Sequence, residues 1–437
     1  MRLFDLTLKL NGFPIDKAEK NIAQRVAMDE PTYNKWLANQ LRQIVQYHLT
    51  NNPFYRELVG KDAVQDWSEV PVMQKTDFQR PLLERLSNGF TEKNCFINKT
   101  SGSSGNPMTF AKDREAHALV WANTKRRFGW YDLDLNTSWQ ARFYGRTLDT
   151  LGGLKLQLKD YLARRYRFDI FDLSDEALEQ VLAKFKTKRF EYLNGYTSSI
   201  VAFAHFLQRK QLILKDVCPS LKVCIVTSEM LFPSDKSLLE KQFGVKVINE
   251  YGASELEIIA IDNLQGDWEV NSQTVYVEIL DDNNQPVPYG VEGKIVVTSL
   301  DNIAHPFIRY EVGDRGILAP NSTLQRPILQ ELTGRTNDVA HLPSGKKPAG
   351  MTFYSITKKL FEDDGQVQEF KIVQTKRDTF EIHYVSQNDL DEPTKLRMQQ
   401  VMTDYLEPNL KFEFLRQTQL GRSLSGKLKQ FENRIPV

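Results

Sequence analysis

The sequence has few of the residues that build cysteine- or histidine-based sites. Its 437 residues include three cysteines, Cys95, Cys218 and Cys224, and no two of them form a CxxC pair. An odd and sparse set of cysteines argues against a disulfide framework and against a zinc site. The six histidines also lack the spacing of metal ligands, so we interpret them as structural.

Long apolar runs and an excess of charge of either sign are also absent. No run of roughly 18 apolar residues occurs, so no membrane span is predicted, and Met1–Asp5 lead into no apolar segment of signal-peptide length. The 57 basic and 56 acidic side chains nearly cancel, which leaves no field to recruit nucleic acid or anionic lipid. We therefore expect a cytoplasmic protein without a nucleic-acid partner. Nothing in the sequence indicates the oligomeric state.

The stretch Thr100–Pro107 stands out by its glycines and hydroxyl groups. Six consecutive residues carry four hydroxyls and two glycines: Thr100, Ser101, Gly102, Ser103, Ser104 and Gly105. Because glycine lets backbone N–H groups approach a ligand closely and hydroxyls add donors, the stretch predicts a phosphate-binding turn. A flexible surface linker is the alternative that composition leaves open. The P-loop motif is excluded, because only two residues separate Gly102 from Gly105 and no lysine follows.

The order of periodic segments predicts an α/β fold in two or three domains, as the chain length also requires. Residues 1–30 show only a weak, mixed pattern. Strands with intervening helices are expected at 192–196, 197–209, 222–227, 233–243 and 245–249. This alternation is typical of a parallel α/β layer. Segments 275–280 and 294–298 predict a β-rich subdomain. From about Gly334, an α-β-β-α-β order predicts a small α+β module, with helices expected at 351–361 and 391–406 and strands at 367–374, 379–385 and 410–415.

Single side chains in later segments suit nucleotide chemistry. Tyr251–Glu255 follows the expected strand 245–249, where loops of a parallel sheet line a ligand crevice. There Tyr251 could stack on a purine and Glu255 could hold Mg²⁺, while a tight turn with a solvated glutamate is the alternative. The carboxylate of Asp314 could accept two hydrogen bonds from a ribose diol, or lie in an ordinary turn.

Two cationic side chains extend this set. Arg335 follows a glycine at a plausible hinge and suits bidentate contact with phosphate. Lys427 lies on a glycine-flanked tip near the C-terminus, where a basic surface tail is the alternative interpretation.

Taken together, these segments resemble the adenylate-forming ligase superfamily, nearest to its phenylacetate–CoA ligase branch. Within that branch the likeness is to ligase-like proteins associated with capsule and surface-polysaccharide synthesis. It rests on Asn194–Ser198, Asn249–Glu255 and Asn302–Asp314, and it covers the chain from about Asn52 onward. The resemblance implies a large N-terminal ATP- and acid-binding domain, residues 1–335, with parallel α/β layers and a β-rich subdomain. It also implies a small mobile α+β C-terminal domain, residues 336–437, that acts as a lid.

The resemblance implies a reaction in two steps. A small carboxylic acid and Mg·ATP give an acyl-adenylate, and a nucleophile then displaces AMP. The turn Thr100–Gly105 would cradle the β- and γ-phosphates, and Lys427 would stabilise charge as the adenylate forms. The other implied nucleotide contacts are Tyr251 against adenine with Gly252 beside it, Ser228 and Glu229 along adenine, Ser254 at the α-phosphate, Glu255 at Mg²⁺, and Asp314 at the ribose with Arg335 nearby. Asp338 is the implied hinge, and Tyr144, Tyr196 and Thr197 are expected to line the acid pocket.

The sequence also departs from the family pattern. Many relatives continue the phosphate turn with Lys-Pro, where this chain has Asn106-Pro107 and so lacks a positive charge near the γ-phosphate. The scattered cysteines cannot copy the zinc site of some branch members, so we expect no zinc. The acceptor stays open between a thiol, with CoA as the first candidate, and an amine such as an amino sugar or amino acid. A non-catalytic nucleotide-binding homologue is the third hypothesis.

Overall fold

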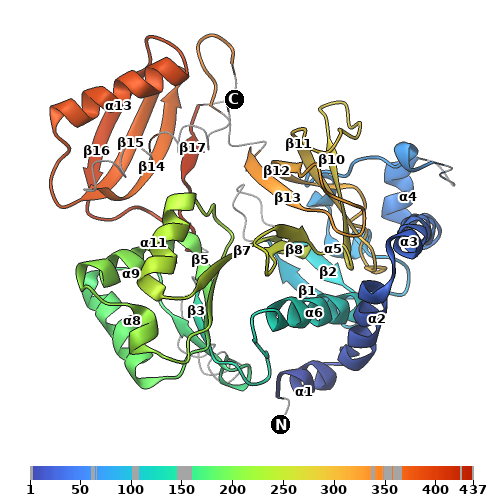
Figure 1. Ribbon diagram of the computed structural model, residues 1–437. Helices are drawn as coiled ribbons and strands as arrows, with labels where there is room; N and C mark the ends of the chain where they lie inside the picture. Colours follow the sequence, from blue (N-terminus) through green and yellow to red (C-terminus); the bar gives the residue numbers. More distant parts are fainter. Residues whose placement is uncertain are drawn as a thin grey trace. The chain divides into compact units, whose positions relative to one another are not determined.

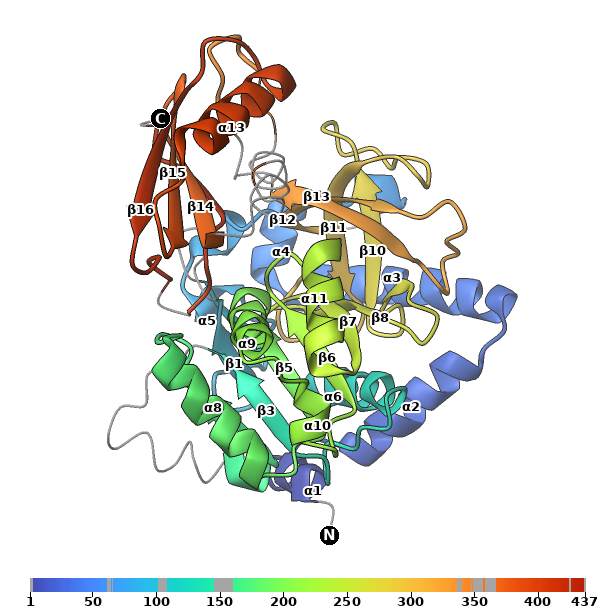
Figure 2. The same ribbon diagram turned by 60° about the vertical axis from the view of Figure 1, so that its left-hand side comes forward.

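The computed structural model describes residues 3–60, 64, 66–100, 108–144, 160–335, 340–346, 348, 357, 367–423 and 426–435. The chain divides into two compact units. The larger comprises Met1–Val312 and Ile317–Glu331, and the smaller comprises Gly313–Gly316 and Leu332–Val437. Figures 1 and 2 show the elements of both units, which are described separately below.

A seven-stranded sheet forms the centre of the larger unit, with strand order β4-β3-β5-β6-β7-β8-β9. The bounds are β3 Gln140–Phe143, β4 Arg165–Phe168, β5 Tyr192–Tyr196, β6 Val223–Thr227, β7 Lys246–Ala253, β8 Glu257–Asp262 and β9 Trp268–Val270. The first five strands in this order are parallel, and the last two are antiparallel. The predicted parallel α/β layer is therefore confirmed.

Strand β7 is longer than predicted. We expected it to end at Asn249, but it continues to Ala253, because the antiparallel strand β8 pairs with its last residues. Tyr251 and Gly252 therefore lie in the strand, and the loop after it is a short turn that contains Ser254 and Glu255. The prediction of a loop over Tyr251–Glu255 was wrong for its first three residues.

Helices cover both faces of this sheet (Figures 1 and 2). One face packs against α8 (Asp175–Thr187), α9 (Thr197–Arg209), α10 (Leu214–Val217) and α11 (Pro233–Phe243). The other packs against α1 (Leu3–Leu10), α2 (Ile15–Ala27) and α6 (Arg114–Gly129). Local capping starts several of these helices: the Ser174 hydroxyl accepts a hydrogen bond from Ala177 N, and Asp113 accepts hydrogen bonds from Glu115 N and Ala116 N.

The chain also forms several further helices, a two-stranded sheet and a second, four-stranded sheet. They are α3 (Glu30–Asn51), α4 (Pro53–Val59), the short helices η1 (Trp67–Glu69), η2 (Asp77–Gln79) and α5 (Leu82–Arg85), and the antiparallel pair β1 (Phe96–Lys99) and β2 (Thr109–Lys112). A four-stranded sheet follows with the order β10-β11-β12-β13, formed by Val275–Leu280, Gly293–Ser299, Tyr310–Leu318 and Leu329–Arg335. This sheet confirms the predicted β-rich subdomain.

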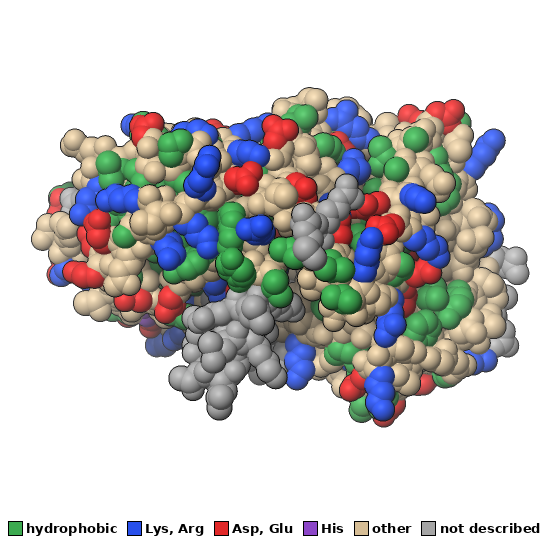
Figure 3. All heavy atoms as spheres, turned by 90° about the horizontal axis from the view of Figure 1, so that it is seen from below, with side chains coloured by type: hydrophobic (Ala, Val, Ile, Leu, Met, Phe, Trp, Pro, Cys, Tyr) green, Lys and Arg blue, Asp and Glu red, His purple; other side chains and the backbone are tan. Residues whose placement is uncertain are grey.

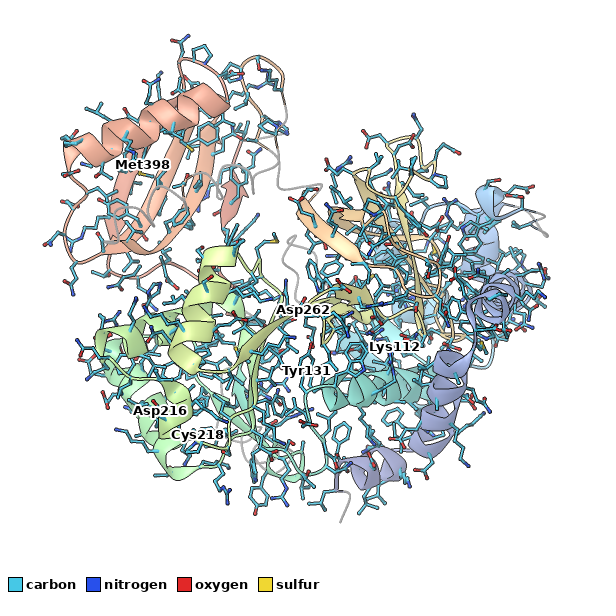
Figure 4. All side chains as sticks on the ribbon, viewed as in Figure 1. Lys112, Tyr131, Asp216, Cys218, Asp262 and Met398 are labelled. Atoms are coloured by element: carbon cyan, nitrogen blue, oxygen red, sulfur yellow. The ribbon has the colours of Figure 1, made fainter. Side chains whose placement is uncertain are left out.

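The smaller unit is built on the sheet β16-β15-β14-β17. Its elements are β14 (Val367–Lys376), β15 (Thr379–Ser386), α13 (Glu392–Tyr405), β16 (Lys411–Gln417) and β17 (Phe431–Asn433). Met398 of α13, labelled in Figure 4, is buried. These elements confirm the α+β class of this region, while most of the helix expected at 351–361 lies outside the described residues.

The surface carries both signs of charge. On the face drawn in Figure 3, basic and acidic side chains are interspersed. Among the described residues, no helix is long and apolar enough to cross a membrane.

Candidate active site

Three predicted site segments meet at one edge of the large sheet. Parallel pairing places Tyr196 opposite Thr227, and Thr227 opposite Glu250. Strands β5 and β6 therefore end side by side, whereas β7 continues to Ala253 before its turn. The carboxyl edge of a parallel sheet is where α/β proteins bind ligands, and it here carries Thr197, Ser228 and the turn at Ser254.

The segment after β6 is fixed against the start of α9. Ser198 N donates to Glu229 Oε2 at 2.7 Å, and the Thr197 hydroxyl donates to the Glu229 carbonyl oxygen at 3.2 Å. A carboxylate at a helix N-terminus is stabilised by the helix dipole. Ser228, with a φ of +69°, makes the sharp turn between β6 and this anchor and is exposed. The predicted contact of adenine with Ser228 and Glu229 stays a prediction.

The turn after β7 requires glycine at position 252. A Cβ there would lie 2.2 Å from the Glu257 carbonyl oxygen of β8, so any larger residue would separate the two strands. Next to it, the buried ring of Tyr251 meets Trp268 edge-to-face, with ring centroids 5.9 Å apart. Ser254 is exposed at the tip of the turn, whereas Glu255 is buried.

Glu255 is held in a defined orientation. The hydroxyl of Tyr310, on β12, donates to Glu255 Oε1 at 3.0 Å. A magnesium ion that works on nucleotides is usually bound by one or two carboxylates together with substrate phosphates and water, so a single oriented carboxylate fits such an ion. Among the described residues, no group of three His, Cys, Asp or Glu side chains could hold a metal ion by itself.

The base of the glycine–hydroxyl turn is closed by Thr100. Thr100 N donates to the Met108 carbonyl oxygen, and Met108 N donates to the Thr100 hydroxyl, both at 2.9 Å. The predicted phosphate contacts Ser101, Gly102, Ser103, Ser104 and Gly105 lie outside the described residues.

The buried side chains of Arg85 and His305 stabilise the β1–β2 hairpin, and sequence reasoning missed them. Arg85 Nη2 donates to the Thr109 carbonyl oxygen at 2.8 Å, while Ala111 N donates to His305 Nδ1 at 3.3 Å. Arg85 Nη1 also contacts His305 Nε2 at 2.7 Å. Burial lowers the pKa of His305 well below its ordinary value, so the ring is neutral. A neutral imidazole has one acceptor nitrogen, so it accepts only one of these two contacts as a full hydrogen bond in either tautomer. These contacts hold strand β2 in position.

Two of the residues expected to line the acid pocket lie together. The rings of Tyr144 and Tyr196 meet edge-to-face with centroids 5.0 Å apart. The Tyr144 hydroxyl donates to Asn194 Oδ1 at 2.9 Å, and burial raises the pKa of this phenol. Gly195 allows the close approach of β3, since a Cβ there would lie 2.2 Å from the Phe143 carbonyl oxygen.

Arg142 belongs to the segment Arg142–Gly145 near which the acid pocket was expected, but it was given no role there, and Glu250 was not predicted for this region. The Arg142 guanidinium lies over the Tyr144 ring, 4.4 Å from its centroid. Glu250 shares the face of the sheet with Tyr196 and Thr227, and burial raises the pKa of its carboxyl to about 7. The sequence feature that could have indicated a polar site here is the presence of Arg142 and Asn194 inside expected strands of a parallel sheet, where apolar residues are usual.

Known proteins resemble this chain in sequence and in fold. No family model matches the chain. It is 23% identical to Protein CapK of Staphylococcus aureus, over 87% of this chain and 85% of that protein. It is 24% identical to phenylacetate-coenzyme A ligase of Aromatoleum evansii, over 75% and 73%. A crystal structure of 2-hydroxyisobutyryl-CoA ligase in complex with R3-HIB-AMP superposes with a TM-score of 0.73, at 19% identity, over 94% of this chain and 92% of the other.

These relatives support the predicted resemblance of the chain to the adenylate-forming superfamily and its phenylacetate–CoA ligase branch. The fold expected of this superfamily is confirmed by the α/β larger unit and the α+β smaller unit. The same fold is found in the amide bond synthetase McbA of Marinactinospora thermotolerans, with a TM-score of 0.52 and 17% identity over 75% of this chain and 66% of the other. The narrower likeness to capsule-associated proteins stays a prediction.

The remaining predicted site residues belong to the smaller unit. Asp314 is half-buried in β12 and follows Gly313, whose φ is +84°. Lys427 is half-buried in a tight turn, in which Ser423 N donates to the Lys427 carbonyl oxygen at 2.9 Å and Lys427 N donates to the Ser423 hydroxyl at 3.1 Å. Arg335 ends β13, and Asp338 lies outside the described residues.

Proposed function

We propose that this protein is an AMP-forming ligase that activates a small carboxylic acid with Mg·ATP and transfers the acyl group to a thiol, with CoA as the first candidate. The observation that carries the proposal is the shared edge of β5, β6 and β7. There the chain, which resembles the adenylate-forming superfamily, assembles a tyrosine pair, an anchored loop and a buried, oriented carboxylate. The 2-hydroxyisobutyryl-CoA ligase of the same fold has been crystallised with an acyl-AMP and with CoA, which supports both steps.

The chemistry demands that two anions approach each other. In our proposal, the acid carboxylate attacks the α-phosphate of ATP, and pyrophosphate leaves. Glu255 would hold a magnesium ion, which would supply positive charge to the phosphate oxygens. The hydroxyls and backbone N–H groups of the turn Thr100–Gly105 bind the β- and γ-phosphates, and Ser254 contacts the α-phosphate. Because the turn lacks the usual lysine, Mg²⁺ bears more of the charge compensation than in relatives.

Other predicted residues are assigned to the rest of the nucleotide. In our proposal, Tyr251 stacks on adenine above Gly252, Ser228 and Glu229 lie along the base, and Asp314 binds the ribose with Arg335 nearby. A lid domain of residues 336–437 turns about Asp338 and carries Lys427. Lys427 stabilises charge during adenylation and is withdrawn for the second step, which admits the acceptor to the same site.

The first experiment measures pyrophosphate release by the purified full-length protein with Mg·ATP and a panel of aryl, hydroxy and dicarboxylic acids. We expect release that depends on one class of acid. The absence of acid-dependent release throughout the panel, with retained nucleotide binding, would favour the non-catalytic alternative.

The second experiment separates the two half-reactions. Lys427→Ala should slow adenylation by roughly 10²–10³-fold, as expected when a charge-stabilising group is removed, yet spare acyl transfer from a preformed acyl-adenylate. Lys429→Ala is the matched control, since Lys429 is exposed two residues away, and it should change neither step more than about twofold. Equal loss of both steps in Lys427→Ala contradicts the assigned role.

Amide formation is the second candidate, supported by the fold shared with an amide bond synthetase. Mass spectrometry of products formed with CoA, amino sugars or amino acids distinguishes the acceptors. A thioester formed only with CoA supports the first candidate, and an amide formed in the absence of CoA supports the second.

A further inference from the structure

Arg142 on β3 is a half-buried cation that pairs with no acidic side chain among the described residues. Its Nε is buried and makes no hydrogen bond, and the guanidinium forms no ion pair with any described residue. Burial lowers its pKa to about 10, so it still carries its charge at neutral pH. A charged side chain that is half-buried, with one nitrogen fully removed from water and unbonded, carries a desolvation cost that no described side chain offsets. Such a group therefore indicates a partner that is supplied from outside the chain.

The guanidinium is nevertheless held in position. It lies over the ring of Tyr144, whose hydroxyl donates to Asn194 Oδ1, and Gln140 Nε2 donates to the same oxygen at 2.9 Å. Asn194 Nδ2 in turn donates to the Ile225 carbonyl oxygen at 3.2 Å. This chain of contacts fixes the ring on which the cation rests, so the terminal nitrogens of Arg142 are preorganised to bind a ligand.

The neighbouring charges favour an anionic ligand. Arg165 on β4 is a second cation whose buried Nε has no partner among the described residues, and its repulsion lowers the pKa of Arg142 further. Arg167 is neutralised by Asp160, with Nε and Oδ2 3.1 Å apart. Glu250 is the nearest candidate counter-charge on β7, but it forms no ion pair with Arg142, and burial leaves much of it protonated near neutral pH. The local charge is therefore positive.

This cation lies beside the tyrosine pair of the candidate acid pocket. Arg142 lies on β3 and Tyr144 directly follows this strand, and the Tyr144 ring contacts both Arg142 and Tyr196. An acid with an apolar tail would bury the guanidinium further without pairing it. A tail that ends in a carboxylate would accept two parallel hydrogen bonds from it, which is the preferred geometry of an arginine–carboxylate pair.

We propose that the acid activated by this protein is a dicarboxylic acid, whose second carboxylate binds the guanidinium of Arg142. The inference rests on the proposed function, because it assigns the substrate class of the same site. One carboxylate is adenylated, and the other determines specificity without taking part in bond formation.

The test compares matched acids. Linear dicarboxylic acids of three to six carbons are assayed by pyrophosphate release beside their mono-amides, which keep the size and polarity but lose the charge. We expect kcat/KM for the best diacid to exceed that of its mono-amide by roughly 10–100-fold, as for a hydrogen-bonded ion pair. Arg142→Gln should remove this preference and leave the mono-amide within about threefold.

Two further variants control this comparison. Arg142→Lys keeps the charge but not the two-pronged geometry, so we expect partial recovery of diacid activity. Arg189→Gln removes an exposed arginine and should leave the preference unchanged. Circular dichroism and thermal unfolding establish that each variant is folded, and the Lys variant carries the test if the Gln variant is not.

The outcomes separate this inference from the proposed function. If mono-amides or monoacids react as well as diacids, or if Arg142→Gln slows all acids equally, the inference is overturned while the ligase function stands. If no acid releases pyrophosphate, the proposed function fails. Calorimetric titration of wild type and Arg142→Gln with the diacids and mono-amides then decides: binding of a diacid that depends on Arg142 supports the inference, and no difference overturns it.

Discussion

The two faces of the seven-stranded sheet have opposite character. On the face under α8, α9 and α11, Phe143, Phe185 and Phe203 are each at most 1% exposed and stack on one another. On the face under α6, the central strands are apolar, but β3, β5 and β7 present Arg142, Asn194 and Glu250. The same strands build both faces, because successive side chains point to opposite sides. One face stabilises the fold, and the other carries the polar groups from which we infer the substrate.

The largest expected effect is a loss of stability caused by a cavity in the apolar face. Phe203→Ala should lower the free energy of unfolding by about 3–5 kcal/mol, because it removes a ring packed against several other phenylalanines and leaves a cavity. Chemical denaturation of the full chain measures the loss. Gln208→Ala, at an exposed position of the same helix, should change stability by less than about 0.5 kcal/mol. A loss below about 1 kcal/mol in Phe203→Ala contradicts the view that this face is the main source of stability.

The next effect depends on pH and belongs to the polar face. Burial raises the pKa of Glu250 from 4.5 to about 7, so the folded state binds a proton more tightly than the unfolded state. The resulting stability is present below pH 4.5 and is lost as the pH rises to about 7. Glu250→Gln, which mimics the protonated form, should therefore stabilise the protein at pH 8 by up to about 3 kcal/mol and have little effect at pH 4.

Denaturation of wild type and Glu250→Gln across this pH range measures the difference. A constant difference at all pH values would mean that Glu250 does not titrate in this window. Glu257→Gln provides a contrast, because Glu257 pairs with Lys112 (labelled in Figure 4), with Oε1 and Nζ 2.7 Å apart. Since that substitution breaks an ion pair, it should destabilise the protein at pH 8.

The smallest effect concerns the sheet edge where the candidate magnesium ligand lies. Tyr310→Phe keeps the buried ring but removes the hydrogen bond to Glu255. We expect a rise of up to roughly tenfold in the Mg²⁺ concentration needed for half-maximal pyrophosphate release, since a hydrogen bond to a charged group contributes about 1.5 kcal/mol or less here. Titration of Mg²⁺ at saturating ATP measures it. An unchanged dependence of pyrophosphate release on Mg²⁺ concentration would contradict the assignment of Glu255 as the magnesium ligand.

Much of the fold could be predicted because its signals are local. The strand Tyr192–Tyr196 and the helix Thr197–Arg209 were predicted with the observed bounds. The helix from Pro233 was predicted to close at Gly244, which adopts a φ of +66° as its C-cap. Caps, prolines and glycines act within a few residues, so their effect can be read without knowing the partners.

Elements that depend on distant partners were missed or misjudged. Helices α1 and α2 lie where the sequence shows only a mixed pattern. Their short apolar stripes, with Phe4, Ile15 and Ile22 buried, become evident only once α6 is known to cover them. The antiparallel strand β8 extends β7 beyond its expected end for the same reason.

In the candidate site, too, some features depend on local sequence and others on contacts between distant segments. The sequence by itself determined which family the chain resembles and which residue types could bind a nucleotide, because motif order and residue chemistry are properties of the chain. Only the tertiary structure decided that Tyr310 orients Glu255 and that Arg142 lies beside Tyr144 with no acidic partner among the described residues. Burial and hydrogen bonding between distant segments arise when the chain folds, and they decide whether a charge is neutralised or left for a ligand.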